Sequence, residues 1–473
     1  MTGLAEAAVT DRVGTQRVGD GEIRSAFAVF AVLCAMTLVV LDAGIVNVAL
    51  PSIGARLQAS PAQTLLVVTA YQAGLMMALL PSGALGERFG HRRIFTLGVG
   101  VFAAASLLCA VSPSLPWLVC ARLLQGLGGA AVMALGVALL RFTVPLGRLG
   151  AAIGWNALTV AIASAAAPPL GALVLQSWGW PALFLINLPL AGAALVATLA
   201  LPVSPRTPHR LDLGSLTLNA VAFGALIAAA EAALRSPRAA FWLAALGVCA
   251  LLLLLRREIP KSAPLLPLDL LRLRSVRLSA SASVCCFAAQ ASGLLALPFL
   301  LQEELGLSPL AAGLHITAWP AAVAATALIA GRLADRVSTA WLCALGGAAL
   351  SAGLAGLALR PLGDTPAAVL SFIALAGVGF GLFQTPNNRA LFLAAPLDRS
   401  GAAGGLQGSA RVTGQTVGAL TTALLFSVTL GEGAPRLGLA TGSVLAMAAA
   451  ALALARRGSG ETPAAPSFAQ RCG

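Results

Sequence analysis

The sequence predicts an all-α polytopic membrane protein with fourteen transmembrane helices. Of its 473 residues, 58% are hydrophobic and only 10% are charged, and the mean hydropathy is +0.89. This balance excludes a soluble domain. Apolar stretches recur at about the 20 residues that a helix needs to cross the hydrocarbon core. They are too long for barrel strands and lack the alternation that such strands show.

Each predicted helix lies between charges or turn residues. The spans are 27–50, 62–82, 94–111, 115–140, 150–176, 182–202, 213–234, 239–256, 276–302, 309–331, 339–359, 366–386, 404–430 and 435–455. The polar N-terminal tail shows no signal-peptide pattern, so we expect it to stay in the cytoplasm.

The net charge of +13 is explained by topology rather than by a nucleic-acid partner. With a cytoplasmic N-terminus, 23 of the 30 Lys and Arg residues fall on the cytoplasmic side. This is the positive-inside asymmetry of an even number of crossings, and it places both termini in the cytoplasm. The exceptions are Arg122 and Arg411 within spans, and Arg56, Arg235, Arg238, Arg360 and Arg436 outside.

Two similar loops divide the chain into halves. GALGERFGHRR (83–93) closes the second span and GRLADRV (331–337) closes the tenth. Two joined halves of six spans would place the second copy after the eighth span, so we infer an inserted pair of helices. We therefore predict a tail (1–26), a six-helix bundle (27–202), a linker with two inserted helices (203–275), a second six-helix bundle (276–457) and a C-terminal tail (458–473).

Four stretches resemble the major facilitator superfamily, in its fourteen-span drug:proton antiporter group. They are LDAGIVNVALP (41–51), GALGERFGHRR (83–93), LVCARLLQGLGGA (118–130) and AIASAAAPPLGA (161–172). The resemblance covers everything except the termini. It implies the major facilitator fold, with a site between two bundles that opens alternately to either side, in the plasma (inner) membrane of a bacterium.

The match to the family pattern has several departures. Gly44 stands where Thr is usual, Glu87 replaces the customary Asp, and His91 replaces a customary Arg. In the fifth span, glycines that are usual in the antiporter pattern are replaced by Ala163, Ala167 and Ala172. Antiport is therefore a weaker implication than family membership.

The resemblance also implies a gate. The paired loops would hold the cytoplasmic side shut through charge-assisted bonds, and the prolines of the fifth span would provide a bend. The alternative for the loops is a solvated turn that only sets topology. The residues predicted to gate are Gly83, Glu87, Arg88, Gly90, Arg92, Pro168, Gly171, Asp335 and Arg336.

Asp42 is the only charged residue between Arg24 and Arg56. A charged acid facing lipid at a helix centre costs about 2.5–3.5 kcal/mol, so we expect it to face a cavity or a partner. Arg122 lies at a similar depth in the fourth span. Burial favours the neutral form of an acid and a guanidinium favours the charged form, so this pair suits proton coupling. A structural ion pair is the alternative.

Polar residues in the middle of spans are candidates for a substrate cavity: Tyr71, Gln72, Gln125 and Gln290. Arg122, Gln125, Gly126 and Gly129 share one helix face. Arg411 lies in a polar stripe of the thirteenth span, where helix packing and substrate contact are both possible readings. Glu231 is a second-choice protonation site near a span end.

Nothing in the sequence indicates an enzyme, a cofactor or a metal site. The eight cysteines show no metal-ligand spacing, and no catalytic cluster appears. We predict a secondary transporter that exports small lipophilic or cationic compounds in exchange for protons. The alternatives are a metabolite symporter or facilitator and, more remotely, a membrane enzyme. The expected partners are a small-molecule substrate, protons and the lipid bilayer, and we expect a functional monomer.

Overall fold

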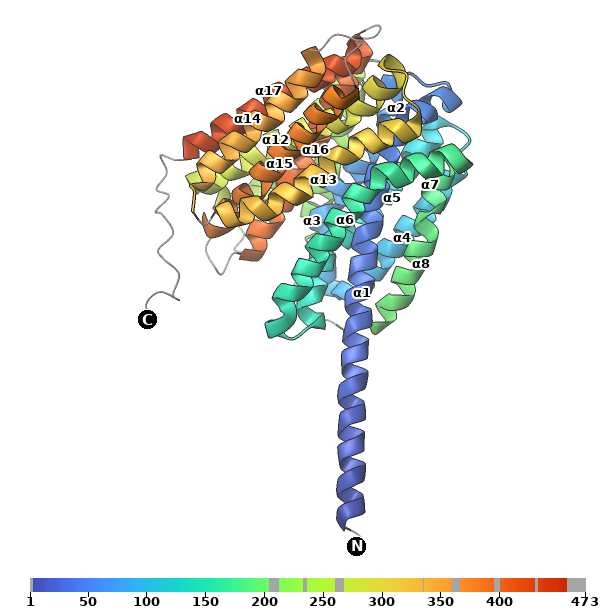
Figure 1. The fold of residues 1–473 in the computed structure, drawn as a ribbon, viewed down its shortest axis with the longest axis vertical. Coiled ribbons are helices and arrows are strands. Elements are labelled where there is room, and N and C mark those ends of the chain that lie inside the picture. The colour runs from blue at the N-terminus through green and yellow to red at the C-terminus, as the bar shows by residue number, and fades with distance from the viewer. Residues whose placement is uncertain are drawn as a thin grey trace.

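The computed structural model describes residues 3–203, 212–232, 236–259, 268–334, 336–359, 366–394, 400–429 and 433–456. Within these ranges the secondary structure is helical, with no strand (Figure 1). Asp335 and the side chain of Glu231 lie outside what the structure describes. The all-α prediction is confirmed.

The first six predicted spans form one group of helices. Their bounds are α1 (Gly3–Leu57), α3 (Leu66–Phe89), α4 (His91–Ala110), α5 (Leu115–Thr143) and α6 (Leu146–Trp178), with α7 (Ala182–Leu185), α8 (Asn187–Ala197) and the 3-10 turn η1 (Thr198–Ala200) sharing the sixth span. The short α2 (Pro61–Thr64) starts with a capping box between Ser60 and Gln63.

The remaining helices also coincide with predicted spans. The inserted pair is α9 (Leu213–Ala232) and α10 (Pro237–Glu258). The second group contains α11 (Leu268–Leu271), α12 (Arg274–Phe299) with the π-turn η2 (Leu300–Glu304), α13 (Pro309–Leu333), α14 (Thr339–Leu359), α15 (Pro366–Ala394), α16 (Ser400–Val428) and α17 (Ala434–Ala455).

Each of the fourteen predicted spans thus has a helix at its position. Among the described residues, 12 helices are long and apolar enough to cross a membrane. The two predicted spans outside that set are α9, whose apolar part is the shorter Leu213–Ala229, and α16, which carries Arg411. Fourteen crossings therefore remains a prediction.

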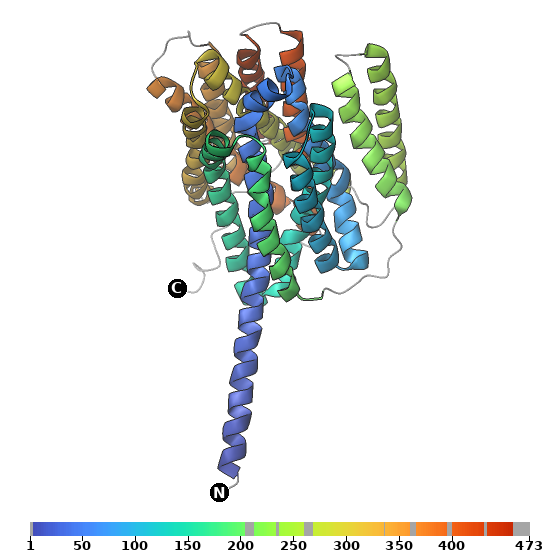
Figure 2. The ribbon, with the colours of Figure 1, turned by 90° about the vertical axis from the view of Figure 1, so that its right-hand side faces the viewer.

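The inserted pair lies at the edge of the molecule (Figure 2). The buried Asn219 of α9 donates from Nδ2 to the carbonyl oxygen of Met77 in α3, at 3.0 Å. α10 packs on α9 and leaves large apolar side chains exposed, including Phe241, Trp242 and Leu252. An apolar exposed face of this kind is expected where a helix meets lipid.

The hydrophobic core differs between the two ends of the bundle. We call the end from which α1 extends toward the N-terminus the N-terminal side, and the opposite end, where α1 finishes at Leu57, the far side (Figure 1). On the far side, one buried cluster contains residues of both groups, for example Val48, Ala172, Ala312 and Leu439.

On the N-terminal side the two groups have separate clusters. The first group packs around residues such as Leu38 and Phe95 and takes only Val412 from the second. The second group has a small cluster of its own around Val276 and Leu406. The groups are therefore joined at the far side and packed apart at the N-terminal side.

Two direct contacts support this joint. Gln302 of η2 donates from Nε2 to the carbonyl oxygen of Val48 in α1, at 3.0 Å. Gly313 of α13 sits against α6 so closely that a Cβ placed there would lie 2.8 Å from the carbonyl oxygen of Pro168. The two groups approach to backbone contact near their far-side ends.

Candidate functional site

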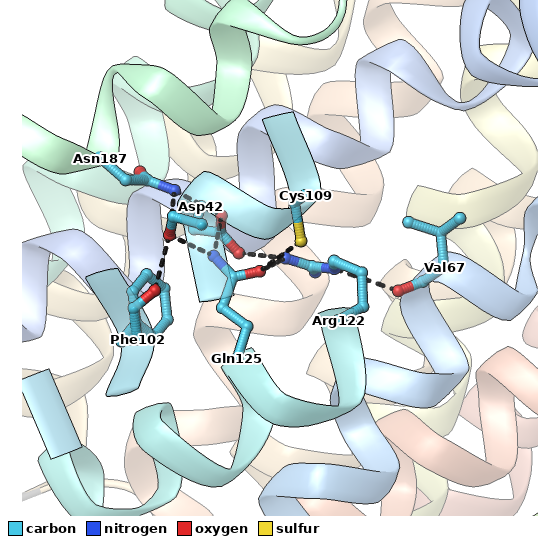
Figure 3. Close-up of polar contacts among 8 residues, drawn as sticks. Asp42, Val67, Phe102, Cys109, Arg122, Gln125 and Asn187 are labelled. Carbon is cyan, nitrogen blue, oxygen red and sulfur yellow. Dashed lines mark hydrogen bonds and ion pairs between the residues drawn. The ribbon is translucent and has the colours of Figure 1, made fainter. Parts of the chain in front are cut away.

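Asp42 is buried inside the first group of helices (Figure 3). Its side chain is 0% exposed, and Arg122 Nη1 of α5 lies 2.5 Å from its Oδ2. The predicted pair is therefore formed, and it faces neither lipid nor water in this conformation. Removing one partner of a buried pair leaves an uncompensated charge, so each residue depends on the other.

Two amides complete the environment of the carboxylate. Oδ1 of Asp42 accepts from Gln125 Nε2 at 2.9 Å and from Asn187 Nδ2 at 2.7 Å. Gln125 Nε2 also lies 2.9 Å from the hydroxyl of Ser106, which in turn donates to the carbonyl oxygen of Phe102. Three donors thus converge on Asp42 from α5 and α8, as an ionised carboxylate requires.

Arg122 is equally well satisfied. Nε donates to the carbonyl oxygen of Val67 at 3.1 Å, and Nη1 also donates to Gln125 Oε1 at 2.6 Å. The guanidinium carbon lies 4.3 Å from the centre of the Tyr71 ring, which is a cation–π distance. One buried cation therefore joins α1, α3 and α5.

Small residues allow this approach. A Cβ on Gly126 of α5 would overlap the carbonyl oxygen of Tyr71, and one on Gly74 of α3 would overlap that of Leu123. The backbones of α3 and α5 are therefore in contact beside the site. Arg122 and Gln125, one turn apart, point from this face toward α1.

The predicted cavity residues have different surroundings. Gln125 belongs to the Asp42 network, and Tyr71 stacks on Arg122 while its buried hydroxyl has no hydrogen-bond partner. Gln72 Oε1 is also buried without a partner, and Gln290 is half-buried on α12. In the described part of the chain, no hydrogen bond joins Gln72 or Gln290 to the network.

The predicted gating loop is a tight turn between α3 and α4. Gly90, with φ of 101°, ends α3 in a conformation that favours glycine. Glu87 and Arg88 are exposed, whereas Arg92 Nη1 donates to the carbonyl oxygen of Leu201 at 3.0 Å. In the second loop Arg336 is exposed, and Asp335 falls outside the described residues. The gating role remains a prediction.

The departures from the family pattern compensate one another. Gly44 of α1 faces Ala167 of α6, and a Cβ on Gly44 would lie 2.5 Å from the Ala167 Cβ. Ala172 of α6 likewise faces Gly313 of α13 in the second group. At the first contact, glycine stands on α1 where the family usually has Thr, and alanine stands on α6 where glycine is usual. Gly171, where glycine is retained, rests against the backbone of Ile45.

Sequence reasoning missed Asn187 and Ser106. Both are fully buried in the network. Asn187 is the first residue of α8, after the short α7, and nothing in local spacing distinguishes it from a packing amide. Its position in LFLINLP (183–189), a stretch similar to the family's sixth span, was the available signal.

The family is shown by comparison with known proteins. The model of the Major Facilitator Superfamily matches residues 32–216 and 213–419. The chain belongs to the Major Facilitator Superfamily. It is an integral membrane transporter and not an enzyme.

The chain is similar along most of its length to several named transporters. It is 40% identical to the Uncharacterized transporter YebQ of Escherichia coli, over 89% of this chain and 93% of that protein. It is 32% identical to the Tetracenomycin C resistance and export protein of Streptomyces glaucescens, over 85% and 76%. It is 29% identical to the Riboflavin transporter RibZ of Clostridioides difficile, over 77% and 80%.

A solved structure supports the fold. The crystal structure of a bacterial homologue of the human lysosomal transporter Spinster superposes with a TM-score of 0.69 at 14% identity, covering 92% of this chain and 97% of that one. The predicted major facilitator fold is confirmed.

Proposed function

We propose that this protein exports small lipophilic compounds in exchange for protons, with Asp42 as the proton-binding residue. The relatives include a protein named for resistance and export, which supports the direction of transport. The observation on which the proposal rests most is the fully buried Asp42, held by Arg122, Gln125 and Asn187 within a helical bundle. Acids buried at membrane depth mark ion and proton pathways.

Protonation of Asp42 would rearrange this network. Oδ1 accepts two hydrogen bonds and Oδ2 accepts one, so an added proton would occupy the remaining site on Oδ2, beside Arg122, and weaken the bonds from α5 and α8. It would also remove the negative charge beside Arg122. A change in one bond thereby alters the contacts of α1 with two other helices, which can bias the bundle between two packed states.

The sidedness follows from the basic loops. If the N-terminal side is cytoplasmic, as the positive-inside asymmetry indicates, the far side is external. The groups share a core at the far side and pack apart at the N-terminal side. This corresponds to a transporter closed to the outside. We propose that the two bundles (27–202 and 276–457) rock about this joint, with the bend at Pro168 and Gly171 and the loops 83–93 and 331–337 taking part in gating.

A second candidate is a proton-coupled symporter or facilitator of a metabolite. It is favoured by the similarity to a protein named as a riboflavin transporter. The two differ in the relative direction of proton and substrate movement. Substrate that leaves the cytoplasmic side as protons enter it supports export, whereas movement of both in one direction supports symport.

Transport assays on paired variants can separate coupling from structure. Asp42→Asn leaves Arg122 buried without a counter-charge, so we expect it to lower stability by about 3–5 kcal/mol and to abolish transport driven by a pH gradient. Asp42→Asn combined with Arg122→Gln removes both charges. The double variant should regain stability and still fail to couple.

The measurements are the thermal midpoint of the purified protein and uptake into inside-out vesicles with an imposed pH gradient. Exposed Arg238→Gln at the start of α10 is the control for loss of an arginine. If the double variant is stable and still concentrates substrate under a pH gradient, Asp42 is only a structural residue and the proposal is wrong.

A further inference from the structure

Arg411 is the second cation at membrane depth. It is the twelfth residue of α16, which begins at Ser400, so it lies about 16 Å along the helix. That is near the middle of a hydrocarbon core about 30 Å thick. The sequence alone placed it closer to a helix end, because the predicted span began at 404.

Unlike Arg122, Arg411 has no acidic partner. Among the described residues it forms no ion pair, its Nε is buried without a hydrogen-bond partner, and Nη2 makes only a weak contact with Met133 Sδ at 3.9 Å. Arg411 is half-buried, and cations at membrane depth face a cavity or pair with acids or backbone carbonyls. The guanidinium of Arg411 therefore has N–H groups without good acceptors at membrane depth.

Its neighbours place Arg411 at the boundary between the two groups. Met133 belongs to α5 of the first group, and the nearby Thr413 contacts Met76 of α3 at 3.9 Å between Oγ1 and Sδ. This stretch of α16 thus faces the first group across the seam. Val412, between Arg411 and Thr413, is buried in the core cluster of the first group.

Asp42, by contrast, is not available to a cationic substrate. Among the described residues its partners all belong to the first group, and its side chain is 0% exposed. The predicted export of cationic compounds therefore gains no support from Asp42 in this conformation. The unsatisfied charge at the seam is positive.

We propose that Arg411 binds an anionic group of the substrate, so that the transported class consists of lipophilic acids. The guanidinium is a planar fork that matches the two oxygens of a carboxylate. The apolar surroundings of this stretch of α16 suit a hydrophobic body. This inference deepens the export function proposed above and rests on it for the direction of transport.

An acidic substrate changes the energetics. Exchange of one proton for one monoanion moves two positive charges inward, so transport would respond to voltage, with about a fiftyfold concentration ratio per charge per 100 mV. A proton on Asp42 also removes the negative charge that balances Arg122. Electrostatics alone would then favour binding of the anionic substrate together with the proton. Exchange therefore requires that proton and acid bind in different orientations of the transporter.

Binding to the purified full chain tests the site directly. The probes are 1-naphthoate, 1-naphthamide and 1-naphthylmethylammonium, which share one ring and differ in charge. A ligand that binds only the folded protein raises its thermal midpoint. We expect 1-naphthoate to stabilise the wild type most, Arg411→Gln to weaken its binding at least about tenfold, and Arg411→Lys to retain part of it.

The exposed Arg238→Gln variant is the control and should bind as the wild type does. A preference for the ammonium probe, a carboxylate preference that survives Arg411→Gln, or no stabilisation by any probe would overturn the site. If the carboxylate preference depends on Arg411 but vesicles move acid and protons in the same direction, the site stands and the export function fails.

Discussion

At the scale of single residues, the Asp42 network contains more donors than an ion pair needs. Besides Arg122, the amides of Gln125 and Asn187 both donate to Oδ1. Each donor stabilises the ionised form relative to the protonated form. Any rearrangement that removes one of these donors therefore changes the environment of the carboxylate, which is what coupling to a conformational change requires.

Asn187 should accordingly set the pH dependence of transport. Asn187→Leu removes one donor from the ionised carboxylate, which makes proton binding easier and moves the pH midpoint of exchange upward. A hydrogen bond to a charged group is worth about 1.5–3 kcal/mol, so we expect a shift of roughly one to two pH units. The measurement is substrate exchange at equal pH on both sides, as a function of that pH.

Asn219→Leu is the matched control for this experiment. Asn219 of α9 is also a fully buried amide. It donates to the backbone of Met77 and has no contact with Asp42. It should cost stability without moving the pH midpoint. An unchanged midpoint in Asn187→Leu, or an equal shift in both variants, would show that the amide has no specific role at Asp42.

At the scale of helices, the exchange of small residues between α1 and α6 can be tested. Threonine at position 44 would overlap Ala167, because the Cβ alone would lie 2.5 Å from the Ala167 Cβ. We expect Gly44→Thr to destabilise the protein by about 1–3 kcal/mol, as overpacking does. Ala167→Gly in the same chain should restore most of that loss.

Chemical or thermal unfolding of the two single variants and the double variant measures the coupling between the positions. Gly44→Thr combined with Ala163→Gly is the control, since Ala163 also stands where the family has glycine, but Ala167 and not Ala163 lies within 4 Å of a Cβ at position 44. Equal rescue by Ala163→Gly and Ala167→Gly would mean that the effect comes from general loosening of α6.

Helix positions were predictable from the sequence, whereas pairings between helices were not. The lengths of the apolar stretches were enough to predict where the helices lie. Asp42, Arg122 and Gln125 were identifiable because polar groups in the middle of a span are costly. Asn187 was not identified, since one amide has no periodicity. The compensation of Gly44 by Ala167 depends on two residues far apart in the chain, and only the structure brings them together.

At the scale of the whole molecule, the far-side joint should control which side is open. Gly313 of α13 lies against Pro168 and Ala172 of α6, with no room for a side chain. Gly313→Val should therefore force α13 and α6 apart and favour the state that is open on the far side. Gly100→Val is the control, because a Cβ at Gly100 of α4 meets nothing within 4 Å.

Distances between spin labels at exposed positions can follow this change. One pair, Arg56→Cys and Ser308→Cys, spans the far side, and the other, Arg141→Cys and Arg277→Cys, spans the N-terminal side. In the Gly313→Val background we expect the far-side distance to lengthen and the N-terminal distance to shorten. Because the two groups share a core only at the far side, lengthening at both ends would indicate that the bundles separate instead of rocking, and no change at either end would show that this contact does not hold the far side closed.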